Sequence, residues 1–132
     1  MPGAGSYRGA VPARRRTDPA VGRAAITRVL QGEAAPELAD LRDATRYLLE
    51  ELVERAPGRS VEVRVPPHGA VQCVEGPRHT RGTPPNVIET DARTWVALGT
   101  GSASWDEVRR SGLLRASGER ADLSAYLPLV TP

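Results

Sequence analysis

The spacing of apolar residues divides the chain into helical and extended stretches. Asp18 and Pro19 are typical of a helix start, since Asp caps a helix and Pro fits its first turn; residues 24–30 supply an apolar face, and Gly32 closes it. A longer helix is predicted from about Pro36 to Arg55. Its core-facing stripe recurs at three- and four-residue steps: Leu38, Leu41, Thr45, Leu48, Leu49 and Leu52.

From Ser60 the pattern changes to strict alternation. Residues 61–65 alternate valine with Glu62 and Arg64, which predicts a strand buried on one face. Residues 66–69 read as a turn, and residues 70–75 as the returning strand of a hairpin.

The stretch after residue 86 predicts the order strand, helix, helix, strand, helix. Asp91 caps the first helix, which Gly99 and Gly101 end. Ser104 caps a second, short helix that ends at Gly112. The other elements are a strand at residues 87–88, a strand at residues 113–117 and a closing helix at residues 121–127.

This order of elements resembles the sterol carrier protein family of lipid-transfer proteins, in particular its small bacterial relatives. The resemblance covers roughly residues 37 to 129. It implies an α+β fold with a hydrophobic space between sheet and helices. We expect a long N-terminal helix and a mostly antiparallel sheet of about four or five strands, covered on one face by short helices. The matching positions are Asp91, Trp95, Leu98, Gly101, Trp105, Ser111, Gly112, Leu114, Ser117, Gly118, Leu123 and Leu127.

Length and charge refine this picture. A chain of 132 residues fits one domain, so we assign residues 18–130 to a single sterol-carrier-like domain and residues 1–17 to a disordered basic tail. All 18 basic residues are arginine, and beyond residue 18 the chain has 14 arginines against 15 acidic residues. This near-neutral balance predicts no nucleic-acid surface. The Arg14–Arg16 run predicts transient membrane contact at most, or a solvated tail.

No apolar run is long enough to span a bilayer and the first residues lack the apolar core of a secretion signal, so we expect a cytoplasmic location.

Few residues of the sequence suggest catalytic or metal-binding chemistry. Cys73 is the single cysteine and reads as a small buried residue rather than a nucleophile. His68 lies in a turn and is expected to be exposed and inert. We expect no metal, no cofactor and no enzymatic activity.

The loop from Gly76 to Asn86 has two readings. Arg78, His79 and Arg81 lie among hydroxyl and proline residues, which suits the binding of a carboxylate or phosphate. The same composition also suits a long turn whose polar side chains satisfy their own backbone.

The resemblance implies a carrier that holds a lipid or acyl-type small molecule. Arg78, His79 and Arg81 then form a polar mouth. The alternative is an accessory or dimerising domain of a bacterial thiol-dependent enzyme system, without chemistry of its own. Either a monomer or a homodimer fits the sequence. The expected apolar wall comprises Leu48, Leu52, Val63, Trp95, Leu98, Trp105, Leu114 and Leu127.

Overall fold

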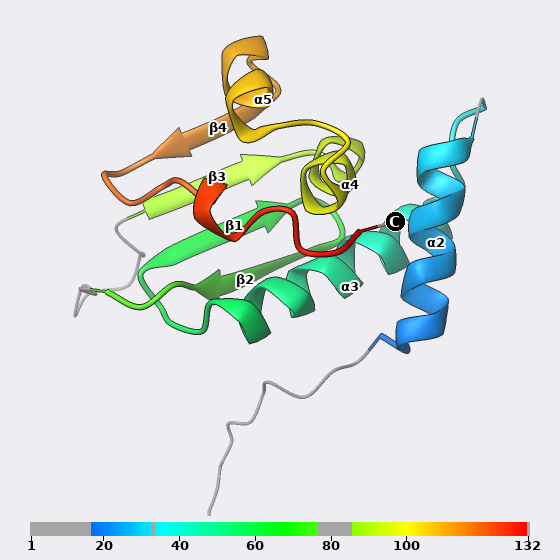
Figure 1. Cartoon of the computed structure of the whole chain (residues 1–132), viewed down its shortest axis with the longest axis horizontal. Helices are drawn as coiled ribbons and strands as arrows, with labels where there is room; N and C mark the ends of the chain where they lie inside the picture. Colours follow the sequence, from blue (N-terminus) through cyan, green and yellow to red (C-terminus); the bar gives the residue numbers. More distant parts are fainter. Residues whose placement is uncertain (1–16, 33, 77–85, 132) are drawn as a thin grey trace, which may run out of the picture.

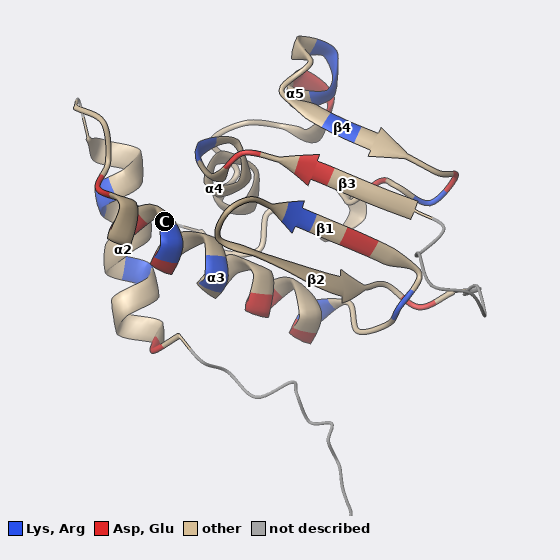
Figure 2. Cartoon of the chain, turned by 180° about the vertical axis from the view of Figure 1, so that it is seen from behind, with Lys and Arg blue, Asp and Glu red and all other residues tan. Residues whose placement is uncertain are grey.

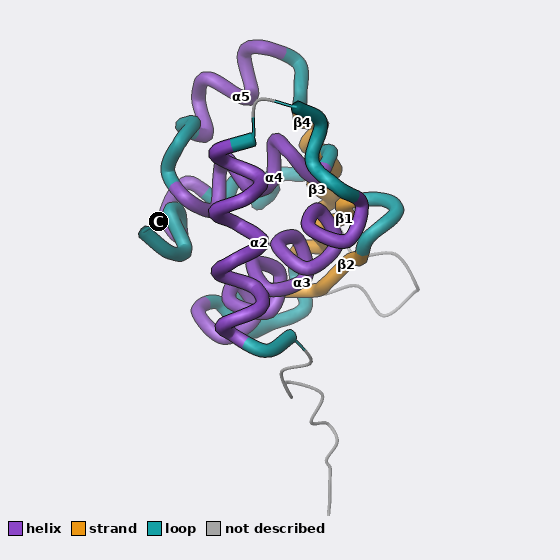
Figure 3. The backbone as a smooth tube through the Cα atoms, turned by 90° about the vertical axis from the view of Figure 1, so that its right-hand side faces the viewer, coloured by secondary structure: helices purple, strands orange, loops and turns teal. Residues whose placement is uncertain are grey.

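The computed structural model describes residues 17–32, 34–76 and 86–131. It is an α+β fold in which the helices gather on one side of a single sheet (Figures 1 and 3). The basic tail up to residue 16 and the loop residues Arg78, His79 and Arg81 lie outside the described residues. The elements are α2 (Pro19–Gln31), α3 (Leu38–Arg55), β1 (Val61–Val65), β2 (Gly69–Cys73), β3 (Asn86–Thr90), α4 (Ala92–Thr100), α5 (Trp105–Ser111), β4 (Leu114–Ser117) and the 3-10 turn η2 (Ser124–Tyr126).

The sheet is mixed, with strand order β2-β1-β3-β4. Its two outer pairs are antiparallel, as expected, but the central strands β1 and β3 run parallel. The buried side chain of Asn86 accounts for this pairing, because its Nδ2 donates to the Ser60 carbonyl oxygen at 2.7 Å. That bond places the start of β3 beside the start of β1. The expectation of a mostly antiparallel sheet therefore holds only for the outer pairs.

One face of the sheet is apolar and the other polar. Val61, Val63, Val65 and Ile88 are fully buried beneath the helices. The opposite face, turned to the viewer in Figure 2, has no helix over it and carries acidic and basic residues. Ion pairs there join Arg64 to Glu62 at 2.8 Å and Arg115 to Glu89 at 3.2 Å. The alternation of apolar and polar residues in the sequence therefore corresponds to the two faces of the sheet, one covered by helices and one uncovered.

The long helix is not the first one. The 13-residue α2 precedes the 18-residue α3, and the two pack against each other (Figure 1). Asp18 caps α2 by accepting from the Ala20 amide at 2.8 Å. Gly22 permits the close approach, because a Cβ there would lie 2.6 Å from the Tyr47 Cβ. The expectation of a long N-terminal helix is therefore corrected: α3 is the long helix and α2 buttresses it.

The expected closing helix over residues 121–127 does not form; only the three-residue η2 turn is helical. Asp122 accepts from the Ser124 amide at 2.8 Å, which favours a turn at this point. Leu123 and Leu129 are buried on the core side, six residues apart; η2 lies between them, and the backbone becomes extended at Leu127. We call residues 121–131 the C-terminal segment.

Candidate functional site

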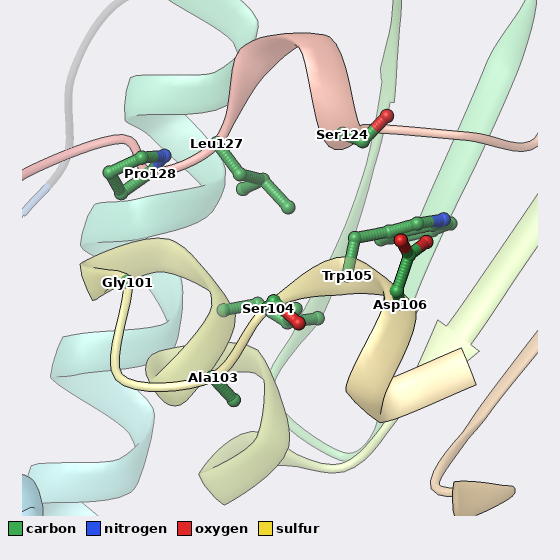
Figure 4. Close-up of a pocket in the computed structure, with 9 residues that line it drawn as sticks. Gly101, Ala103, Ser104, Trp105, Asp106, Ser124, Leu127 and Pro128 are labelled. Atoms are coloured by element: carbon green, nitrogen blue, oxygen red, sulfur yellow. The ribbon is translucent and has the colours of Figure 1, made fainter. Parts of the chain in front are cut away.

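A pocket of about 390 Å³ lies between the C-terminal segment and the turn joining α4 to α5 (Figure 4). It brings together three of the expected wall residues, Leu98, Trp105 and Leu127, from α4, α5 and the C-terminal segment. Its apolar residues are thus supplied by stretches that are separate in sequence. The full lining is Leu98, Gly101, Ala103, Ser104, Trp105, Asp106, Ser124, Leu127 and Pro128.

Helix caps fix the wall formed by α4 and α5. α4 ends at Gly101, whose positive φ of 82° suits glycine and turns the chain. Ser104 then begins α5 with a reciprocal cap: its Oγ accepts from the Glu107 amide at 3.1 Å, and the Glu107 carboxylate accepts from the Ser104 amide at 2.9 Å. These hydrogen bonds lower the pKa of Glu107. The turn therefore presents Trp105 and Asp106 in a fixed orientation.

Arg55 holds the opposite wall. From the last turn of α3, its Nη1 donates to the Pro128 and Tyr126 carbonyl oxygens at 2.8 and 3.3 Å, and its Nη2 donates to the Leu129 carbonyl oxygen at 2.9 Å. The guanidinium fork thus binds three backbone carbonyls, a geometry that lysine cannot reproduce. Leu127 is held at the pocket because the residues on both sides of it are bound.

A second attachment joins the C-terminal segment to α4. The amides of Leu129 and Val130 both donate to the Gly99 carbonyl oxygen, at 2.8 and 3.1 Å. Leu129 is 3% exposed and so anchors the segment in the core. Both walls of the pocket are therefore attached to α4.

The rim of the pocket is polar. Ser104, Asp106 and Ser124 are exposed and belong to the pocket lining, and Trp105 and Asp106 are neighbours in it at the start of α5 (Figure 4). Asp106 carries the single charge among the nine lining residues. The pocket therefore combines an apolar interior with hydroxyl groups and one carboxylate.

The other expected wall residues lie elsewhere. Leu48, Leu52, Val63 and Trp95 are fully buried in the core between α3, α4 and the sheet, and none of them lines this pocket. Leu114 instead borders a separate polar depression of about 710 Å³ beside β4. The sequence pattern identifies these residues as apolar and inward-facing, but it does not separate those that fill the core from those that line a pocket.

Several residues of the site were not expected from the sequence. The sequence indicates that Ser104 caps a helix, and nothing in the residues around it indicates a pocket. Asp106 reads as an ordinary acidic residue in a first helical turn. Arg55 gives no signal at all, because its partners lie more than 70 residues further along the chain.

The remaining titratable groups of the described part of the chain include one histidine. Burial, then the charges of Arg46 and Arg42, lower the pKa of His68, so its neutral form is favoured. No group of three His, Cys, Asp or Glu side chains in residues 17–32, 34–76 and 86–131 is placed to hold a metal ion. The helices described include none with the length and apolarity needed to cross a membrane.

The buried thiol gives a first prediction. Cys73 is fully buried, and burial raises its pKa to about 12. The reactive thiolate is then roughly one part in 10⁵ at pH 7. We expect a thiol reagent such as Ellman's reagent to leave the folded protein unmodified for hours and to modify one thiol per chain after unfolding in guanidinium chloride. Rapid modification of the folded chain would contradict the structure at this position.

Comparison with protein families agrees with this arrangement. The family described as bacterial SCP ortholog matches residues 37–129, which run from the start of α3 to the anchoring residue Leu129. A comparison with curated proteins found no match. The matched range contains the whole sheet, every residue that lines the pocket, and the core apart from Ala25, Ile26 and Val29 of α2. The chain therefore belongs to the bacterial SCP ortholog family, which is sterol carrier protein-like.

Proposed function

We propose that this protein binds a lipid or other apolar small molecule in the pocket between the α4–α5 turn and the C-terminal segment. The observation that carries the proposal is the convergence of Leu98, Trp105 and Leu127 on one pocket of about 390 Å³. Small-molecule pockets usually enclose about 300–1,000 Å³ and combine apolar walls with a few polar groups. Membership of a sterol carrier protein-like family supports the carrier role.

Packing between the helices and the sheet favours this pocket over the core as the binding site. A Cβ added at Gly99 would lie 2.9 Å from the Leu48 Cδ1, so α4 and α3 are already in close contact. The Trp95 indole fills the adjoining space, with its Nε1 donating to the Thr45 carbonyl oxygen at 3.3 Å. A ligand entering here would have to displace side chains. No observation favours the alternative of an accessory domain in a thiol-dependent enzyme system, and the burial of Cys73 argues against thiol chemistry.

A charged side chain in the apolar wall should weaken binding. Leu127 is half-buried at the pocket, and we expect Leu127→Arg to reduce the affinity for a neutral fluorescent probe, N-phenyl-1-naphthylamine, by about tenfold or more. The affinity is measured by the rise in probe fluorescence on titration with protein.

The matched control places the same charge outside the pocket. Leu113 is 56% exposed and does not line the pocket, so Leu113→Arg should leave probe affinity unchanged. Circular dichroism melting shows whether each variant is folded. Failure of the native protein to bind the probe, or equal losses in the two variants, would refute the proposed site.

A further inference from the structure

We infer that the pocket selects a cationic amphiphile, an apolar chain with an amine or quaternary ammonium head, and that Asp106 is the residue that selects it. This inference rests on the proposed function and adds the chemical class of the ligand. It follows from the single charge among the lining residues and from the aromatic ring and hydroxyl groups that line the same pocket.

The carboxylate of Asp106 is available for a ligand. It is exposed, and within the described part of the chain it forms no ion pair. Two arginines follow it on α5, but neither lies within ion-pair distance of it. A cationic head group would therefore meet a carboxylate that has no competing partner among these residues.

Three arginines near the site act on other groups, Arg55 through hydrogen bonds and Arg109 and Arg110 through their charge. Arg55 donates to three carbonyl oxygens of the C-terminal segment. Asp122 has a lowered pKa, caused first by hydrogen bonds from Ser124 and also by the charge of Arg109. Glu107 has a lowered pKa, caused first by hydrogen bonds with Ser104 and also by the charge of Arg110. None of the described residues that line the pocket is an arginine, so an acidic head group would find no cationic partner among them.

The neighbouring side chains complete a site suited to an ammonium group. Trp105 precedes Asp106 at the start of α5 and lines the same pocket, and aromatic rings attract cations, tryptophan most strongly. The Ser104 and Ser124 hydroxyl oxygens line the same pocket and can accept hydrogen bonds from an amine. A carboxylate or phosphate head would instead be repelled by Asp106. This preference is opposite to the anion-binding reading of the loop of residues 76–86, which is one of the two readings that its sequence allows.

Three ligands with the same ten-carbon chain test the inference: decylamine, decanol and decanoate. Each displaces N-phenyl-1-naphthylamine from the full chain at pH 7 and low salt, below its micelle concentration. We expect decylamine to bind about tenfold more tightly than decanoate, with decanol between them, which is the size expected for one exposed charge acting attractively or repulsively. Raising the salt concentration to about 0.5 M should shrink the difference, because exposed charges are screened.

Two variants assign the effect to one residue. Asp106→Asn should bring decylamine and decanoate to within about twofold of each other. Glu119→Gln removes the same charge from an exposed residue outside the pocket and should leave their ratio as in the native protein. If decanoate equals or exceeds decylamine, or if the preference survives Asp106→Asn, the inference is overturned while the binding function stands. If none of the three displaces the probe, the proposed function itself fails.

Discussion

Replacing Trp95 with alanine is expected to lower the free energy of unfolding by about 3–5 kcal/mol, the cost typical of removing a large aromatic side chain from a packed core. Trp95 is fully buried and joins α4 to α3 through its hydrogen bond to the Thr45 carbonyl oxygen. The change would leave a cavity and remove the hydrogen bond that joins the two helices. Guanidinium denaturation followed by far-ultraviolet circular dichroism measures the loss.

Trp95→Phe separates packing from the hydrogen bond. It keeps an aromatic ring and removes the indole donor, so a smaller loss of about 1–2 kcal/mol is expected. A loss below about 1 kcal/mol for Trp95→Ala would show that the ring borders empty space rather than the core. The pair of variants therefore decides whether Trp95 is part of the core or part of a ligand wall.

Arg55→Ala is expected to release the C-terminal segment. Three hydrogen bonds from a charged donor are lost, and allowing for their partial exposure to solvent we expect a loss of about 1–3 kcal/mol in the free energy of unfolding. Affinity for N-phenyl-1-naphthylamine should fall as well, because Leu127 and Pro128 leave the pocket wall. Hydrogen exchange at the Leu129 and Val130 amides, which donate to Gly99, should become faster.

Two matched variants test the specificity of that contact. Arg59 is exposed and its Nε donates to the Gln72 side-chain oxygen at 3.3 Å, so Arg59→Ala removes the same charge with little expected effect on stability or on exchange. Arg55→Lys keeps the charge without the planar fork and should lie between the native protein and Arg55→Ala. Unchanged exchange at Leu129 and Val130 in Arg55→Ala would show that Gly99 alone holds the segment.

Much of the fold could be predicted from local sequence patterns. Caps at Asp18, Asp91 and Ser104, and the alternation in residues 61–65, describe interactions between near neighbours, and the structure confirms them. The parallel pairing of β1 with β3 was not predictable in this way. It depends on the Asn86 side chain reaching Ser60, a contact between residues 26 positions apart.

The prediction of a closing helix was wrong, again in part because of contacts between residues far apart in the sequence. Residues 121–127 carry an apolar pattern compatible with a helix, but Arg55 and Gly99 bind the backbone that follows, and Asp122 starts a turn. At the site, their apolar character identified Leu98, Trp105 and Leu127 as wall residues, but it did not show that they line the same pocket. Asp106 and Arg55 acquire their roles only from the arrangement of distant segments.

Gly99 links the packing of the core helices to the position of the C-terminal segment at the surface. Its missing side chain sets the distance from α4 to Leu48, and its carbonyl oxygen receives the two amides that fix the C-terminal segment. The spacing of two core helices and one of the two attachments of the C-terminal segment therefore meet at one residue. A substitution at Leu48 that shifts α4 would also shift the carbonyl oxygen to which this segment is bound.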